Sequence, residues 1–287
     1  MCQYRRDSNL TGYMSVTLFS IIAIFLYLLA ACWMGVRVFS RDAAPSTFKY
    51  RLLAVGGVAL LLHAFVLHHT IITDQGYDLG FYHAFSLMSW VVVLLVLLTV
   101  LIRPTENLAI VFLPFTALAL ILEQVFSSDH MISDHASIGL RMHVVLSISA
   151  YSLLAIAAVQ SIILAVQEYQ LRHKHPVPSL RLFPPMQTME EFLIQLLAIG
   201  FFLLSLSLAT GLMFVHNIMA QHLAHKIVFS ILAWLLFGLV LLGRWRRGWR
   251  GKTLIRWTLG GFISLMLAYF GSKLVLELIL NRVYWTP

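Results

Sequence analysis

The sequence predicts an all-α, polytopic membrane protein with about eight transmembrane helices in a single membrane domain over residues 1–287. Of its 287 residues, 60% are hydrophobic and only 11% are charged, and the mean hydropathy is +0.86. A soluble domain of this size needs far more charge to cover its surface. The apolar residues also form long continuous blocks, and a helix needs about 20 such residues to cross a hydrocarbon core. Because backbone groups in lipid must be satisfied internally, these blocks are expected to be helices.

Eight such blocks follow one another along the chain. They lie near residues 14–37, 52–72, 82–102, 107–125, 142–167, 192–216, 227–243 and 257–280. The longest connection, residues 168–190, is polar and basic and contains prolines. Most blocks contain no acidic or basic residue; Glu123 in the fourth and Lys273 and Glu277 in the eighth are exceptions. We therefore expect the chemistry of this protein to lie in its few polar intramembrane residues.

Lysine and arginine residues are concentrated on one side of the predicted bundle. Of the 20 basic residues, most fall in the first, third, fifth and seventh connections, whereas the alternate connections carry aspartates. The positive-inside rule places the basic side in the cytoplasm, so the loop 168–190 is cytoplasmic and both termini are periplasmic. The predicted location is the bacterial inner (plasma) membrane. The net charge of +8 is then a topology signal, and no nucleic-acid partner is expected.

Histidines gather on the opposite, outer side. Of the 12 histidines, two fall in the cytoplasmic loop and His63 lies in the middle of the second block. The other nine belong to the predicted outer ends of helices or outer loops: His68, His69, His83, His130, His135, His143, His216, His222 and His225. Scattered surface histidines would not prefer one side, so this grouping is the strongest indication of a site.

Histidine side chains are compatible with several kinds of functional site. Imidazole is a common metal ligand and titrates near neutral pH. Two histidines on different helices are enough to hold a haem iron, whereas zinc or copper needs three or four converging ligands. No phosphate-binding loop, glycine-rich fingerprint or serine–histidine nucleophile motif is present, and we do not expect the chain to be an enzyme.

Several stretches resemble a known family. The run 143–152 (HVVLSISAYS) resembles the segment that opens with the family's first outer histidine, and 182–189 (LFPPMQTM) resembles its approach to the next helix. Further matches in order and spacing are 224–226 (AHK), Trp234, 247–251 (RGWRG), 268–271 (AYFG) and, more weakly, 81–83 (FYH) with Trp90. With these features the chain is similar to the cytochrome c assembly proteins of the CcsA, CcmC and HemX type, and within them to the YpjD-like inner membrane proteins.

The resemblance implies haem handling at the outer face and a function in cytochrome c assembly. His143 takes the place of the family's first outer haem ligand. Of the family's tryptophan-rich motif only Lys226 remains, and Asn281 stands where the second outer histidine is expected. We therefore predict His225, or His216 or His222, as the second ligand of the haem iron. A haem propionate is a candidate partner for Lys273.

The expected cofactor is haem b, and the expected partners are apocytochrome c and a second membrane or periplasmic assembly subunit. An alternative hypothesis is a transporter or accessory subunit for metal ions or small cations, with histidines as ligands or proton-coupled gates and with Glu123 and Glu277 on the ion path. A further alternative is a structural or regulatory membrane subunit without haem.

Overall fold

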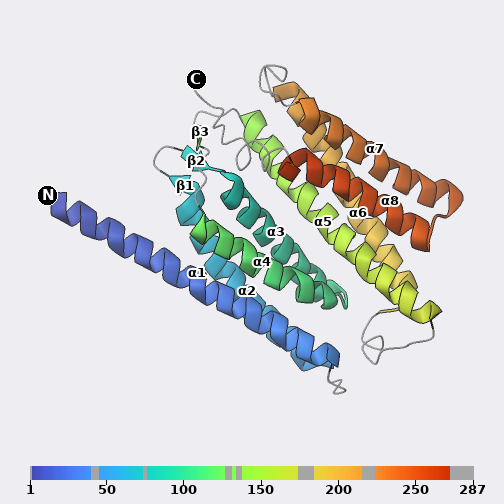
Figure 1. Cartoon of the computed structure of the whole chain (residues 1–287), viewed down its shortest axis with the longest axis horizontal. Helices are drawn as coiled ribbons and strands as arrows, with labels where there is room; N and C mark the ends of the chain where they lie inside the picture. The colour runs from blue at the N-terminus through green and yellow to red at the C-terminus, as the bar shows by residue number, and fades with distance from the viewer. Residues whose placement is uncertain are drawn as a thin grey trace. The chain divides into compact units, whose positions relative to one another are not determined.

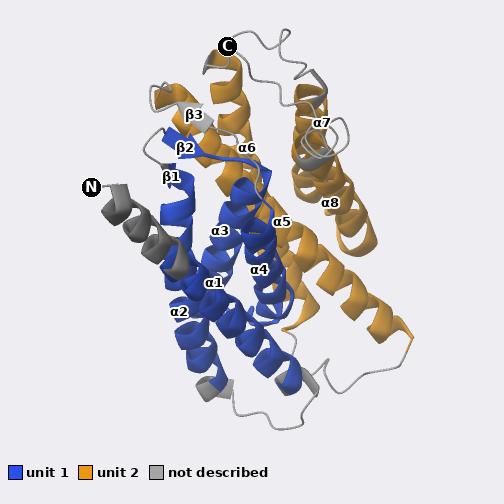
Figure 2. Cartoon of the chain, turned by 60° about the vertical axis from the view of Figure 1, so that its left-hand side comes forward, with its two compact units in different colours: residues 1–136, 178–183 blue, residues 137–177, 184–287 orange. Residues whose placement is uncertain are grey.

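The computed structural model confirms an all-α helix bundle (Figure 1). It describes residues 2–39, 45–73, 76–126, 131–133, 138–173, 184–214 and 224–271. Contacts divide the chain into two compact units, which Figure 2 shows in different colours. Unit 1 comprises residues 1–136 and 178–183, and unit 2 comprises residues 137–177 and 184–287. The single membrane domain stays a prediction.

Unit 1 is a ring of four helices. These are α1 (Cys2–Phe39), α2 (Pro45–Ile71), α3 (Phe81–Ile102) and α4 (Asn107–Val125). Each helix packs against the next, and α1 also packs against α4, which closes the ring. Short connections favour such antiparallel neighbours in a bundle. Part of the core is an apolar cluster in which Ala23, Val66 and Leu120 are fully buried.

A small antiparallel sheet, which the sequence analysis did not predict, lies beside the ends of α2 and α3. Its strands are β1 (Ile72–Thr73), β2 (Gly76–Asp78) and β3 (Met131–Ser133), in the order β1-β2-β3. Tyr77 is the partner of Ile72 in one pair and of Ile132 in the other. The strands are too short to give a recognisable alternating pattern. The sheet holds Asp78 close to the first turn of α3.

Unit 2 is a second ring of four helices. These are α5 (Ile138–Arg172), α6 (Met186–Phe214), α7 (Ala224–Arg247) and α8 (Gly251–Met266), which continues as the π-helix η2 (Leu267–Gly271). Neighbours along the chain pack together, and α5 also packs against α8. Several helices begin or end outside the predicted apolar blocks; α8 begins at Gly251 instead of residue 257. Hydropathy marks only the part of a helix that lies in lipid, so the polar turns at its ends escape detection.

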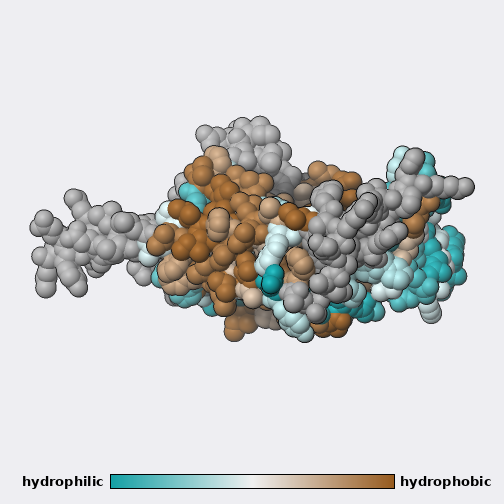
Figure 3. Space-filling model, turned by 90° about the horizontal axis from the view of Figure 1, so that it is seen from below, coloured by the Kyte–Doolittle hydropathy of each residue, from teal (hydrophilic) through white to brown (hydrophobic). Residues whose placement is uncertain are grey.

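Seven of the described helices are long and apolar enough to cross a membrane. They are α1 to α7, and in all of them except α5 no more than half of the apolar window is buried inside the protein. The eighth predicted block, 257–280, is described only as far as Gly271. Figure 3 shows broad areas of hydrophobic residues on the surface of one face. Exposed apolar surface on this scale is expected where lipid replaces water around a protein.

Among the described helices, α5 and α6 have the most extensive contact. The two helices run antiparallel, since contacts join 143 to 211, 154 to 200 and 160 to 189. Gly200 permits the close approach in the middle of the pair: a Cβ atom there would lie 2.8 Å from Cγ of Leu154. Small residues at such contacts are typical of membrane helix packing.

Gly200→Ala is therefore expected to destabilise unit 2. Leu154 is fully buried and cannot move away without a rearrangement of the core, so we expect a cost of about 1–3 kcal/mol. The measurement is the free energy of unfolding in detergent. Gly260→Ala in α8 is the control, since no atom lies within 4 Å of its added Cβ. An equal effect of the two substitutions would contradict the packing described here.

Candidate functional site

His143 lies in the first turns of α5 and its ring points at α6. Its Nδ1 lies 2.9 Å from the backbone carbonyl oxygen of Ser207. Thr210 places its hydroxyl 3.5 Å from the same nitrogen, and Gly211 lies so close that an added Cβ would stand 2.9 Å from Cε1 of the ring. Residues 207, 210 and 211 share one face of α6 because they are three and four positions apart. This face forms a seat for the imidazole, which we call the His143 seat (Ser207, Thr210 and Gly211).

Hydrogen bonding fixes the tautomer of His143. A carbonyl oxygen only accepts, so Nδ1 must carry the proton that it donates to Ser207. In neutral imidazole the lone pair is then on Nε2. Oγ of Ser147 lies 3.5 Å from Nε2. The hydroxyl of Ser147 donates instead to the backbone oxygen of His143, at 2.6 Å.

A second serine completes this arrangement. The hydroxyl oxygens of Ser147 and Ser207 lie 2.7 Å apart, and because the Ser147 proton is used by the carbonyl, Ser207 donates to Ser147. Among the described residues, therefore, no donor gives its proton to the Nε2 lone pair of His143. An imidazole whose Nδ1–H is bound by a backbone carbonyl and whose Nε2 is free has the arrangement found in metal-ligating histidines.

The seat fits an axial ligand better than a polydentate metal site. Among the side chains that the structure describes, no group of three or more histidine, cysteine, aspartate or glutamate residues is placed to hold a metal ion. Zinc and copper sites need such groups. A haem iron needs one or two axial ligands, with the porphyrin supplying the others. Nε2 of His143 provides one nitrogen of the kind that fills an axial position.

The remaining predicted ligands cannot be placed. His225 lies in the first turn of α7, but its side chain is outside the described residues, as are His216, His222 and Lys273. The second ligand and the propionate partner stay predictions.

Three other outer histidines are described. His68 and His69 are exposed on the last turn of α2, with their ring centroids 5.4 Å apart. His83 lies between two carboxylates in unit 1. These three histidines belong to unit 1, whereas His143 belongs to unit 2.

Sequence reasoning missed the His143 seat, although a signal was present. Serine, threonine and glycine at 207, 210 and 211 share one face in the largely apolar second half of α6. They oppose His143 and Ser147, which share one face of α5. Hydroxyl groups inside an apolar span are expected to find hydrogen-bond partners on neighbouring helices. The seat can be recognised only when it is known that this face of α6 packs against this face of α5.

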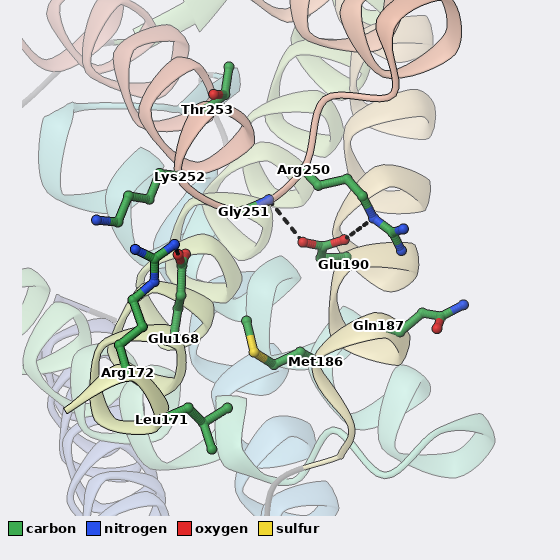
Figure 4. Close-up of a pocket in the computed structure, with 10 residues that line it drawn as sticks. All are labelled: Glu168, Leu171, Arg172, Met186, Gln187, Glu190, Arg250, Gly251, Lys252 and Thr253. Carbon is green, nitrogen blue, oxygen red and sulfur yellow. Dashed lines mark hydrogen bonds and ion pairs between the residues drawn. The ribbon is translucent and has the colours of Figure 1, made fainter. Parts of the chain in front are cut away.

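The opposite end of unit 2 contains a charged pocket of about 720 Å³. It is lined by Glu168, Leu171, Arg172, Met186, Gln187, Glu190, Arg250, Gly251, Lys252 and Thr253. Figure 4 shows Glu190 at its centre, accepting hydrogen bonds from the backbone N–H of Gly251 at 2.9 Å and from Nε of Arg250 at 3.1 Å. Glu190 is nearly buried, and it ties the turn between α7 and α8 to the start of α6. This end is the predicted cytoplasmic one, since α5 separates it from His143.

Helix α6 begins before the predicted apolar block, which starts near residue 192. Thr188 followed by Glu191 has the form of a capping box, but α6 begins at Met186. Glu191 instead accepts a hydrogen bond from the side chain of Gln187, at 3.2 Å. Glu190, one residue earlier, anchors the turn between α7 and α8, because its side chain points inward to that turn. The turn contains Gly248 and Gly251, both of positive φ.

Comparison with known proteins identifies the family. The sequence model of the family described as "Cytochrome C assembly protein" matches residues 51–280. The chain belongs to the cytochrome c assembly protein family. The match includes α3 to α8, and with them His143 and its seat.

The chain is also similar to individual bacterial proteins. The inner membrane protein YpjD of Escherichia coli K12 is 32% identical over 228 residues, which cover 77% of this chain and 85% of that protein. A 28.8 kDa protein in the nifR3-like 5′ region of Azospirillum brasilense is 33% identical over 146 residues, or 50% of this chain and 54% of that protein. No solved structure matches. Family membership and the apolar helices support a multi-pass inner membrane protein with a role in cytochrome c biogenesis.

Proposed function

We propose that this protein binds haem at the outer face of the inner membrane, with Nε2 of His143 as one axial ligand of the iron, and that it handles haem as cargo during cytochrome c assembly. The observation that carries the proposal is the hydrogen bond from Nδ1 of His143 to the carbonyl oxygen of Ser207. It orients the ring and leaves the Nε2 lone pair for a metal. A haem of the b type, not covalently attached, is the proposed cargo.

The rest of the site is proposed from the sequence. His225, or His216 or His222, provides the second ligand, and Lys273 pairs with a propionate. The protein makes and breaks no covalent bond of its own. Apocytochrome c and a second membrane or periplasmic assembly subunit are the proposed partners, because attachment of haem needs thiols that the substrate provides.

Haem content after purification tests this function. The protein is expressed with ample haem and purified in mild detergent, and its haem content is measured by a pyridine haemochrome assay, with oxidised and reduced absorption spectra. The wild type is expected to hold haem in a fixed ratio near one per chain and to give a low-spin spectrum. His143→Ala is expected to lose that spectrum, since the axial nitrogen is removed.

His173→Ala is the matched control. His173 follows α5 at its other end and is exposed. Its Nδ1 lies 2.9 Å from the carbonyl oxygen of Tyr169, one turn earlier, and its ring packs against the ring of the same residue. Its removal is expected to leave haem content unchanged. A wild type free of haem under these conditions would refute the proposal and leave cation transport or a structural role as the hypotheses to be tested.

A further inference from the structure

The charged pocket at the predicted cytoplasmic end of unit 2 has no role in the proposed haem site. Its walls come from the end of α5, the start of α6 and the start of α8. Figure 4 shows Arg172 and Lys252 on one side of Glu190 and Arg250 on the other. The pocket is therefore a cavity of about 720 Å³ with basic side chains on two sides.

The two acidic residues of the charged pocket already have partners. Oε1 of Glu190 accepts the backbone N–H of Gly251 at 2.9 Å, and its Oε2 accepts Nε of Arg250 at 3.1 Å. Oε1 of Glu168 lies 2.9 Å from Nη2 of Arg172, one turn later on the same helix. Each carboxylate thus neutralises one guanidinium group and holds it beside the cavity.

Several donors of the pocket remain without an acceptor in the described part of the chain. Arg250 uses only Nε toward Glu190, so its two terminal nitrogens have no hydrogen-bond partner there. Lys252 forms no ion pair and Thr253 no side-chain hydrogen bond with any described residue, and both are exposed. A further guanidinium, that of Arg244, lies 3.9 Å from Oε2 of Glu190. Basic groups therefore outnumber acidic ones at this site, and the unused donors favour an anion with several oxygens.

A phosphate group matches this set of donors. The guanidinium fork fits the spacing of phosphate oxygens, and lysine adds a compact positive charge. The same pocket also has an apolar part, formed by Leu171 and Met186, and Leu171 is 51% exposed. A ligand that joins a phosphate to apolar groups satisfies both parts of the lining, and a phospholipid is such a ligand.

The position of the pocket along α8 corresponds to the headgroup layer of a membrane. Trp257 opens the apolar part of α8 and stacks on Trp249, with ring centroids 6.1 Å apart. Tryptophan is enriched at the membrane–water interface. Thr253, which lines the pocket, lies one turn before Trp257, or about 6 Å along the helix axis. Since the headgroup layer adds roughly 5–8 Å on each side of the hydrocarbon core, the pocket lies at the depth of the lipid phosphates.

We propose that the charged pocket binds the headgroup of an anionic phospholipid of the cytoplasmic leaflet, with its phosphate oxygens held by Arg250, Lys252 and Thr253. Basic pockets between membrane helices on the cytoplasmic side are suited to such headgroups. The bound lipid joins the start of α8 to the ends of α5 and α6 that meet there. The site is separate from the proposed haem site, since it lies at the other end of α5 from His143.

Lipid titration followed by native mass spectrometry tests the proposal. The full-length protein in detergent is titrated with dioleoyl phosphatidylglycerol and, separately, with dioleoyl phosphatidylcholine, and bound lipids are counted from the mass of the complex. The first phosphatidylglycerol is expected to bind about tenfold more tightly than the first phosphatidylcholine, because the choline group places a positive charge beside the basic side chains. Equal affinities for the two lipids would overturn the proposal.

Two variants with the same change of charge locate the lipid. Lys252→Glu is expected to lower the affinity for the first phosphatidylglycerol about 10–30-fold, because a positive charge is replaced by a negative one. An acidic residue in the first turn of a helix favours folding, so this loss does not come from unfolding. Arg247→Glu is the control, since Arg247 is exposed at the end of α7 and does not line the pocket. It should change the affinity by less than about twofold, because exposed charges outside the site are screened by salt.

Equal losses of affinity in the two variants would show that the lipid does not bind in the pocket. A further titration in millimolar inorganic phosphate separates a lipid from a soluble ligand. Phosphate is expected to leave phosphatidylglycerol bound, since the free ion makes no apolar contact with Leu171 and Met186. Displacement of the lipid would assign the pocket to a soluble phosphate compound and would overturn the lipid assignment.

Discussion

Glu190→Ala is expected to destabilise unit 2 by about 2–4 kcal/mol, because it removes two hydrogen bonds to a charged acceptor, each worth roughly 1.5–3 kcal/mol and not fully additive. Glu190 is 6% exposed, so water does not replace it easily. Its loss leaves the turn between α7 and α8 without its contact to α6. The measurement is the free energy of unfolding of the purified protein in detergent.

The neighbouring glutamate offers a matched control for this prediction. Glu191 is exposed and accepts a hydrogen bond from the side chain of Gln187, one turn earlier. Glu191→Ala is expected to change the free energy of unfolding by less than about 0.5 kcal/mol, as surface substitutions usually do. Similar effects of the two substitutions would show that Glu190 does not anchor the turn.

Gly211→Ala is expected to weaken haem binding by about 10–100-fold, the usual effect of disturbing a residue that orients a metal ligand. The added Cβ would stand 2.9 Å from Cε1 and 3.2 Å from Nδ1 of His143. A ring at the end of a flexible side chain escapes such a contact by rotating, which breaks its hydrogen bond to Ser207. The cost should therefore appear in haem affinity more than in stability.

Titration with haem at a fixed protein concentration measures this effect, with the free energy of unfolding determined in parallel. Gly260→Ala, where nothing lies within 4 Å of the new Cβ, is expected to match the wild type in haem affinity. If Gly211→Ala bound haem as tightly as the wild type, the seat on α6 would have no role in orienting His143.

The sequence predicted the bundle well because membrane insertion depends on a local property. A continuous apolar block of sufficient length is enough to form a spanning helix, and the described helices lie over the predicted blocks. The polar ends of the helices were missed for the same reason. Gly251 to Arg256 are polar or mixed and are not part of an apolar block, yet they form the first turns of α8.

The contacts between helices were less predictable. His143 was singled out from its predicted outer position and from the family resemblance. The contacts of Ser207 and Gly211 with it can be recognised only when α6 is known to pack against α5. Glu123 was noted as an intramembrane acid, whereas its pairing with His83 and Thr70 depends on three helices and a sheet too short to detect. Such sites join residues far apart in sequence, and one sequence without aligned relatives holds no direct record of their contacts.

The central claim is that Nε2 of His143 binds the haem iron, and chemical rescue of a ligand-deleted variant tests it most directly. His143→Gly removes the imidazole and leaves space beside Gly211. The variant with haem added is expected to give an altered spectrum, and free imidazole should restore the low-spin spectrum of the wild type in a saturable manner. A variant that retains the wild-type spectrum without imidazole would contradict the claim, because the iron would then have its ligands elsewhere.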